Sequence, residues 1–240
     1  MKYIGSKNKI AKDIVPIIQK YIDDSRTEIY IEPFVGGFNV IDKIKCKYRY
    51  ASDIDSIVID LVDACIRNPE LLNSLPILPT REHYNDVKDN EYKYDKWYRS
   101  AILLFASYNA KVYGGGYGAF AKTKDGNIRN YFKEAKSNFE KQLPNLDDIT
   151  ILTLDYKKAV NCNNAVIYCD IPYKNGIGYK TDFNHNEFYE WCKIQSSNGN
   201  IVLISEYEMP SDFKCIWSKD IKVHLNNRNK IDKTEKLFTI

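Results

Sequence analysis

The sequence contains few of the residues from which metal sites and disulfide frameworks are built. Its three histidines, His83, His185 and His224, lie far apart along the chain, so we expect no metal site. The six cysteines form no C-x-x-C pair, and several lie in apolar stretches. This usage is typical of reduced, buried thiols in a cytoplasmic protein.

Long apolar runs are also absent. No segment approaches the roughly 20 residues that a membrane-spanning helix needs, and residues 1–5 do not begin a signal peptide. We therefore expect no membrane partner and a cytoplasmic location in a bacterial or phage-infected cell. The chain has 240 residues, enough for one α/β domain with an insertion. Abundant Lys, Ile, Asn and Tyr indicate an AT-rich genome such as that of a phage or prophage.

Charge is unevenly distributed along the chain. The net charge is +3, yet residues 107–141 and 214–236 each hold seven Lys or Arg against three Asp or Glu. The remainder is therefore net acidic. Two basic segments on an acidic body favour a polyanionic partner.

The segment 165–173 is the strongest signal for chemistry. Residues 165–169 form an apolar run typical of a buried parallel strand, and Asp170-Ile171-Pro172-Tyr173 follows at the end where α/β sheets place their ligands. Pro172 disfavours a helix at Ile171 and leaves the Ile171 carbonyl available as an acceptor. A carboxylate, a carbonyl and an aromatic ring suit a planar ring with an amino group, such as a flipped-out nucleobase. The alternative is an ordinary strand that ends in a turn.

A second ligand signal lies near the amino-terminal end. Residues 28–32 read as a strand, Pro33-Phe34-Val35-Gly36-Gly37 as a turn, and residues 38–44 as a helix. Two adjacent glycines allow a ligand to approach the backbone closely. Their spacing differs from G-x-G-x-x-G, so NAD is not expected.

An acidic residue follows the next predicted strand, residues 48–52. Asp53 lies about twenty residues after the first strand, where a carboxylate binds a ribose diol in βαβ folds. Asp55 is predicted to cap the following helix. Ser6, which precedes these strands, is predicted to cap an amphipathic helix, and Pro16 is predicted to kink or break that helix. Tyr3 and Lys7 are predicted to fold over a ligand that the glycine turn holds.

The βα alternation lapses over residues 68–141, which we interpret as an insert within one domain made of residues 1–67 and 142–240. An apolar helical stretch, 97–108, precedes a loop rich in glycine and tyrosine, and basic residues interleaved with aromatics follow. That mixture suits contact with phosphates and bases. The alternative is an idle solvated insertion, although loops of this length are more often functional.

The sheet is predicted to resume after the insert. The expected elements are strands at 149–154 and 200–205, a helix around 186–195, and a final hairpin over 217–240 with strands at 221–225 and 237–240. Asp155 and Tyr156 follow the first of these strands.

Taken in this order, the motifs resemble those of the Dam-type DNA adenine methyltransferases over essentially the whole chain. Residues 2–7 look like that family's amino-terminal cofactor motif, residues 32–37 like its glycine motif, and residues 170–173 like its catalytic tetrapeptide. Asp53 matches its ribose-binding acid, and Asp155-Tyr156 its adenine-edge position. Ile171 stands where proline is commoner in the family; since only the backbone carbonyl is used there, little should change.

The resemblance implies a Rossmann-like S-adenosylmethionine-dependent methyltransferase sheet with a mainly helical target-recognition insert, acting on adenine in double-stranded DNA. The catalytic residues it implies are Asp170, Ile171, Pro172 and Tyr173. The cofactor-binding residues it implies are Tyr3, Lys7, Phe34, Val35, Gly36, Gly37, Asp53, Asp155, Tyr156 and Asp170. The DNA-binding residues it implies are Lys111, Tyr113, Tyr117, Lys122, Lys124, Arg129 and Arg228.

Three alternatives stay open at the level of sequence. The same acceptor geometry serves the amino group of cytosine or of an RNA adenine, and the fold can also bind nucleic acid without turnover. No nuclease motif is evident in the chain, which favours a solitary methyltransferase over a fused restriction enzyme. A separate cognate restriction endonuclease is a further partner that the sequence allows.

Overall fold

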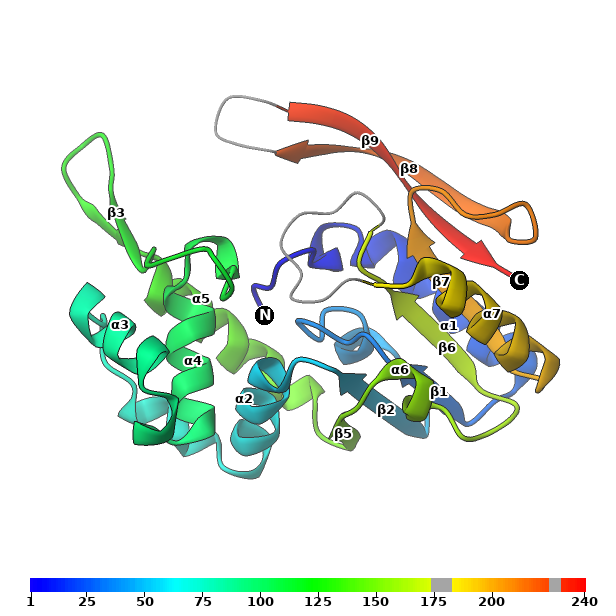
Figure 1. Cartoon of the computed structure of the whole chain (residues 1–240), viewed down its shortest axis with the longest axis horizontal. Coiled ribbons are helices and arrows are strands. Elements are labelled where there is room, and N and C mark those ends of the chain that lie inside the picture. Colours follow the sequence, from blue (N-terminus) through cyan, green and yellow to red (C-terminus); the bar gives the residue numbers. More distant parts are fainter. Residues whose placement is uncertain (174–182, 225–229) are drawn as a thin grey trace.

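The computed structural model describes residues 1–173, 183–224 and 230–240. Its main feature is a seven-stranded sheet in the order β5-β2-β1-β6-β7-β9-β8 (Figure 1). The parallel strands are β1 (Ile29–Glu32), β2 (Tyr48–Asp53), β5 (Ile149–Thr153), β6 (Val166–Asp170) and β7 (Ile201–Glu206). The antiparallel edge is β9 (Lys230–Thr239) and β8 (Lys214–His224). The predicted Rossmann-like α/β sheet is confirmed.

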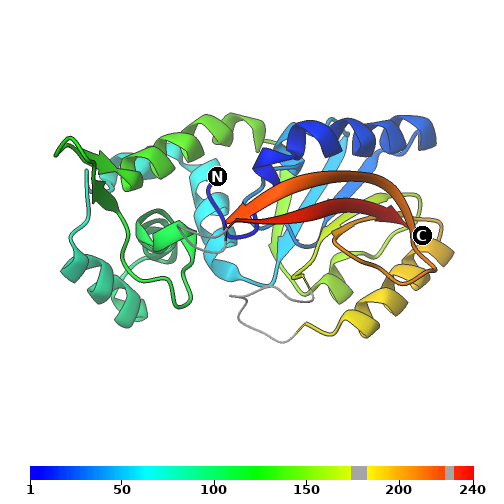
Figure 2. The same ribbon diagram turned by 90° about the horizontal axis from the view of Figure 1, so that it is seen from above.

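Helices cover both faces of this sheet. Helix α1 (Ala11–Ser25) lies on one face, and α6 (Tyr156–Ala159) and α7 (His185–Ser197) lie on the other (Figure 2). Successive residues of β6 alternate between the two resulting cores. Tyr168 packs in the core that contains α1, while Ile167 and Cys169 pack in the core that contains α7. This period of two explains why the strand is apolar throughout.

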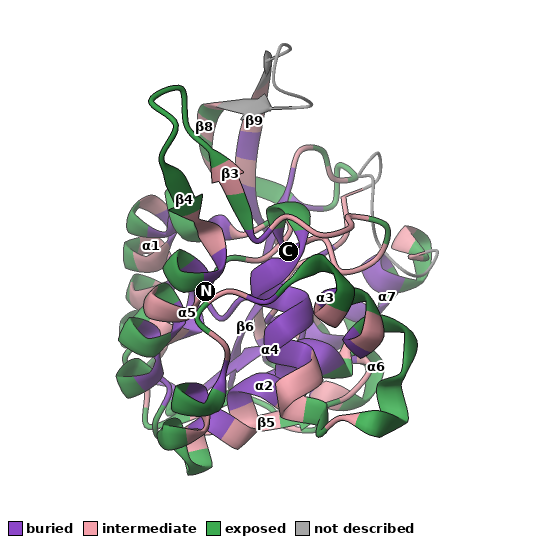
Figure 3. Ribbon diagram, turned by 90° about the vertical axis from the view of Figure 1, so that its left-hand side faces the viewer, coloured by how far each residue is buried: buried purple, intermediate pink, exposed green. Residues whose placement is uncertain are grey.

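The insert is mainly helical. It contains α3 (Arg81–Asp89), α4 (Lys96–Ala106) and α5 (Tyr131–Gln142), and α4 packs against α2 (Ser56–Arg67). A hairpin of β3 (Phe120–Lys122) and β4 (Ile128–Asn130), which the sequence did not predict, projects with largely exposed residues (Figure 3). The proposed boundary after residue 141 falls at the end of α5, and the division into domains stays a prediction.

Four local predictions were wrong in part. Residues 38–44 form no α-helix, because Phe38 adopts a left-handed backbone (φ 58°); only a short 3-10 helix, Ile41–Lys43, follows. Pro16 does not end α1. Ser6 caps a 3-10 helix, Lys7–Lys9, that precedes α1. The C-terminal strands are longer than predicted because they pair with each other along almost their whole length.

The cysteines are all free, and Cys65, Cys169 and Cys192 are buried as expected, whereas Cys215 is exposed on β8. Within the described ranges, no helix is long and apolar enough to cross a membrane. The same ranges contain no group of three or more His, Cys, Asp or Glu side chains placed to hold a metal ion.

Candidate active site

A cavity of about 460 Å³ opens at the carboxyl ends of the parallel strands. It lies where the strand order reverses between β1 and β6, which is the usual ligand position in such sheets. Residues 34–37 after β1, Asp53 at the end of β2 and Asp170 at the end of β6 all line it, as do Tyr3 and Lys7. The structure therefore brings together residues that the sequence spreads over 170 positions.

Asp53 is fixed by the glycine turn. The Gly36 amide donates to Asp53 Oδ2 at 2.9 Å, and the Asp55 amide donates to Oδ1 at 3.0 Å. Burial raises the pKa of Asp53 to about 6, although these backbone donors oppose the shift. Asp55 in turn caps α2 through the Ile57 amide, as predicted. A rigid carboxylate thus faces the cavity beside the turn.

The turn itself has no room for side chains. A Cβ added to Gly37 would lie 2.5 Å from Asn39 Nδ2 and 2.8 Å from Tyr3 Cβ. One added to Gly36, whose φ is +45°, would lie 2.9 Å from the Tyr3 ring. Tyr3 therefore packs directly on the glycines, which explains the need for glycine at both positions.

An aromatic cluster forms another wall of the cavity. The rings of Phe34 and Tyr156 stack with centroids 5.2 Å apart, and Phe183 contacts both at 5.7 and 5.8 Å. Asp155, also on the wall, caps α6 by accepting a hydrogen bond from the Lys157 amide. Phe183 was not predicted, since nothing in its local sequence distinguishes it from a core residue.

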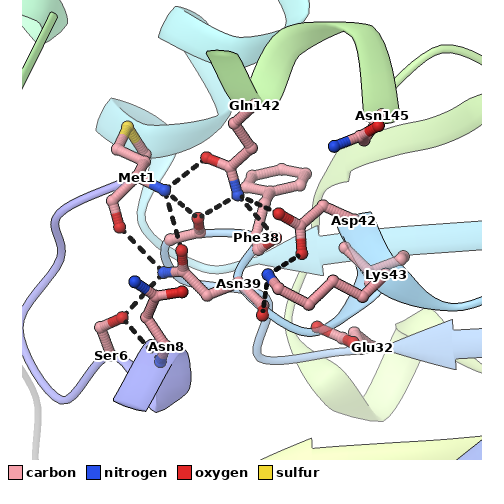
Figure 4. Close-up of polar contacts among 12 residues, drawn as sticks. Met1, Ser6, Asn8, Glu32, Phe38, Asn39, Asp42, Lys43, Gln142 and Asn145 are labelled. Carbon is pink, nitrogen blue, oxygen red and sulfur yellow. Dashed lines mark hydrogen bonds and ion pairs between the residues drawn. The ribbon is translucent and has the colours of Figure 1, made fainter. Parts of the chain in front are cut away.

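The glycine turn is also tied to the insert (Figure 4). Gln142, the last residue of α5, donates to the carbonyls of Gly37 and Phe38 at 3.2 and 2.8 Å and to Asp42 at 3.0 Å. Its side-chain oxygen accepts a hydrogen bond from the Met1 amino group, which also donates to Asn39 at 2.8 Å. Sequence reasoning missed Gln142, because its partners lie about 100 positions away.

Two residues of the predicted catalytic tetrapeptide, Asp170 and Pro172, line this cavity. Lys7 Nζ is 2.5 Å from Asp170 Oδ1, and 4.5 Å from the centroid of the Tyr173 ring. Burial raises the pKa of Asp170 to about 6, against the opposing effect of Lys7. Burial lowers the pKa of Lys7, but Asp170 and Glu235 reverse this effect and leave the pKa raised. Next to Tyr173, the Pro172 carbonyl lies 3.0 Å from His185 Nε2.

Glu235 on β9 is a residue of this site that sequence reasoning missed. It is buried, it accepts a hydrogen bond from the Tyr173 hydroxyl, and its Oε1 lies 3.6 Å from Lys7 Nζ. The only signal in the sequence was an acidic residue within a basic segment. Its role depends on the pairing of β9 with β7, which local sequence does not reveal.

The predicted DNA-binding residues separate into two groups, and their roles stay predictions. Lys111 and Tyr113 line the cavity, and the Tyr113 hydroxyl donates to Asp55 at 3.1 Å. Tyr117 packs inside the insert, with its hydroxyl donating to the Pro79 carbonyl at 2.5 Å and its ring 5.2 Å from the guanidinium of Arg81.

The second group lies on the β3–β4 hairpin, where Lys122, Lys124 and Arg129 are exposed. Arg129 pairs with Glu134 through two hydrogen bonds, at 2.7 and 3.0 Å. Arg228 falls outside the described residues. Within the described residues, Lys122 and Lys124 form no ion pair, whereas Arg129 would have to leave Glu134 to bind a phosphate.

Comparison with known proteins decides the family. The D12 class of N6 adenine-specific DNA methyltransferases matches residues 3–235. The chain belongs to this family. The D12-class chain is 24% identical over 259 residues to the type II methyltransferase M.FokI of Planomicrobium okeanokoites, a match that covers 93% of this chain and 38% of that protein. It is 26% identical over 245 residues to the type II methyltransferase M.MjaIII of Methanocaldococcus jannaschii, covering 87% and 84%.

Membership of the D12 class fits the site. The class takes its methyl group from S-adenosylmethionine and acts on DNA. An aromatic wall beside a fixed carboxylate and a glycine turn suits an adenosine-containing ligand. A phage origin and a separate restriction endonuclease stay predictions.

Proposed function

We propose that this D12-class protein transfers a methyl group to the exocyclic amino group of adenine at a specific site in duplex DNA, after flipping the base out of the helix. The observation that carries the proposal is the position of Asp170 and Tyr173. Asp170 lines the cavity, and both residues are in contact with Lys7. No other carboxylate in the described part of the chain lies at the end of a central strand next to an X-Pro-Tyr turn.

S-adenosylmethionine, when bound, supplies an electrophilic methyl group on a positively charged sulfur. Asp53 would hold its ribose, and the glycine turn would lie against its amino-acid end. The aromatic wall of Phe34 and Tyr156 would pack against its adenine, with Asp155 at the ring edge. The lining of one continuous cavity by all these residues supports the assignment.

The residues of the tetrapeptide orient the target base. Flipping costs a few kcal/mol, which stacking on Tyr173 helps to offset. Asp170 and the Ile171 carbonyl each accept one amino hydrogen, so the nitrogen lone pair is held out of the ring plane. Asp170 is chiefly ionised at neutral pH, because its pKa is about 6. Orientation and electrostatics therefore provide most of the catalysis.

The insert and the C-terminal hairpin would hold the duplex. The β3–β4 hairpin and the β8–β9 pair extend on the same side of the molecule in two views (Figures 1 and 3). Exposed Lys122 and Lys124 suit phosphate contact, which positions the duplex without reading its sequence.

The test is methylation of unmodified duplex DNA with labelled S-adenosylmethionine, followed by digestion to nucleosides and chromatography. We expect the label in N6-methyladenosine. Asp170→Ala should abolish transfer while cofactor affinity stays that of the wild type and the protein stays folded, although loss of the buried partner of Lys7 lowers its unfolding temperature. Asp24→Ala, a change at an exposed acid on α1, is the matched control and should keep full activity.

Other outcomes would change the proposal in defined ways. Label in methylated cytosine would mean that Asp170 and the Ile171 carbonyl hold the amino group of cytosine instead of that of adenine. Cofactor binding without transfer to DNA would favour an RNA adenine or a binding module without turnover. A cognate restriction endonuclease, cutting the same site when it is unmethylated, stays a prediction.

A further inference from the structure

Lys7 occupies the two contacts that a target base needs. Its Nζ lies 2.5 Å from Asp170 Oδ1 and 4.5 Å from the centroid of the Tyr173 ring, and its side chain is 8% exposed. A base held by Asp170 and stacked on Tyr173 would compete with Lys7 for both. Base entry is therefore coupled to movement of this lysine.

Movement of Lys7 away from Asp170 costs much free energy unless a second anion is available. A buried ammonium that loses its carboxylate partner is strongly destabilised. Glu235 Oε1 lies 3.6 Å from Lys7 Nζ, and the Glu235 side chain is 3% exposed. A small rotation of the lysine side chain would bring the two groups into hydrogen-bond range.

Glu235 also holds the stacking ring. The Tyr173 hydroxyl donates to the same Oε1 atom, and the Tyr173 ring contacts Tyr207 with centroids 4.5 Å apart. Glu235 lies one residue before Lys236, which pairs with Glu206 at the last paired position of β7 and β9. Strand β9, which joins the C-terminal hairpin to the central sheet, therefore reaches the proposed catalytic centre.

Building on the proposed function, we propose that Lys7 is a placeholder for the target base and that Glu235 is a positioning residue that receives Lys7 when the base enters. Before entry, Lys7 neutralises Asp170 and covers Tyr173. After entry, Lys7 pairs with Glu235, and the amino group of the base takes its place at Asp170. No covalent change of either residue is involved.

Glu235→Gln is the variant that separates charge from hydrogen bonding. The amide oxygen can still accept from the Tyr173 hydroxyl, but it offers Lys7 no charge. We expect single-turnover methylation to fall about 10-fold or more, the scale of a lost hydrogen bond to a charged group, with cofactor affinity unchanged. The fluorescence of 2-aminopurine at the target position, which rises when the base leaves the stack, should fall too.

Asp220→Asn is the matched control. Asp220 lies on the same hairpin, is exposed, and accepts a hydrogen bond from Thr234 at 2.7 Å without contacting Lys7. This change should alter neither the methylation rate nor the fluorescence. A loss equal to that of Glu235→Gln would assign the effect to the hairpin as a whole and overturn the proposal.

Removal of the placeholder gives the decisive readout. Lys7→Met alone should give 2-aminopurine fluorescence at or above the wild-type level, and combined with Glu235→Gln it should restore the fluorescence to at least that level, because nothing then competes with the base. A merely structural role of Glu235 predicts no such rescue. Two results would overturn the proposal. One is methylation at the wild-type rate by Glu235→Gln, and the other is 2-aminopurine fluorescence in the double variant as low as in Glu235→Gln alone. Transfer to cytosine by the wild type would overturn only the adenine assignment, since a fluorescent cytosine analogue permits the same comparison.

Discussion

Asp170 and Asp53 both have a pKa that burial raises to about 6, but the proposed function gives them different ligands. In that proposal, protonation of Asp170 would remove an acceptor for the target amino group, whereas protonation of Asp53 would remove an acceptor for a ribose. The two effects should therefore appear in different measurements.

We expect the single-turnover methylation rate, at saturating cofactor, to rise as pH increases from 5 to 7 and then to level off. The rise follows ionisation of Asp170 through its pKa of about 6. Cofactor affinity should rise over the same range in Asp170→Asn, which retains Asp53. A transfer rate that is constant between pH 5 and 7 would contradict this assignment.

Gly37 allows a second test at the scale of one residue. In Gly37→Ala the new methyl group would lie within 3 Å of Asn39 and Tyr3, so the turn must shift and cofactor affinity should drop about 10-fold or more. Gly199→Ala is the contrasting variant, because its φ is +83° but its surroundings are open. Gly199→Ala should lower the free energy of unfolding by about 1 kcal/mol, as urea unfolding would show. It should leave cofactor affinity unchanged, as calorimetry would show.

At the scale of elements, the connection between α5 and the glycine turn depends on Gln142. Gln142→Ala leaves the Phe38 carbonyl and Asp42 without this donor, so we expect a loss of about 1–3 kcal/mol in the free energy of unfolding. Cofactor affinity should fall as well, because the turn loses its support.

Gln19→Ala is the control for that change. Gln19 also joins an element to a distant segment, since it makes two hydrogen bonds from α1 to the backbone of Lys45, but it is partly exposed and does not line the cavity. Its replacement should cost less stability and leave cofactor affinity unchanged. Equal effects of both variants on cofactor affinity would show that Gln142 has no special connection to the turn.

Elements with local signals could be predicted from sequence, whereas contacts between distant elements could not. The apolar run before Asp170 predicted β6, and the spacing to Asp53 predicted its place beside the glycine turn. The helix expected over residues 38–44 failed because Phe38 adopts a left-handed conformation that its apolar side chain does not signal. Glu235 was missed since its place follows from the pairing of β9 with β7.

At the scale of the whole molecule, the net charge of +3 is too small to explain strong binding to DNA by itself. Affinity should depend instead on where the positive charge lies. The exposed lysines of the β3–β4 hairpin are the clearest described candidates, because Lys122 ends β3 and Lys124 lies in the turn that projects from the insert.

Each phosphate contact that a lysine makes contributes about 0.9 to the slope of log affinity against log salt concentration. Combined Lys122→Ala and Lys124→Ala should therefore reduce that slope by about 2 and weaken binding equally to all sequences. Lys20→Ala, an exposed lysine on α1 that pairs with Asp24, should leave the slope unchanged. Fluorescence anisotropy over a salt series measures the affinity for DNA and its dependence on salt concentration. If these lysines contact bases instead of phosphates, their replacement would weaken binding to the recognition site more than binding to other DNA.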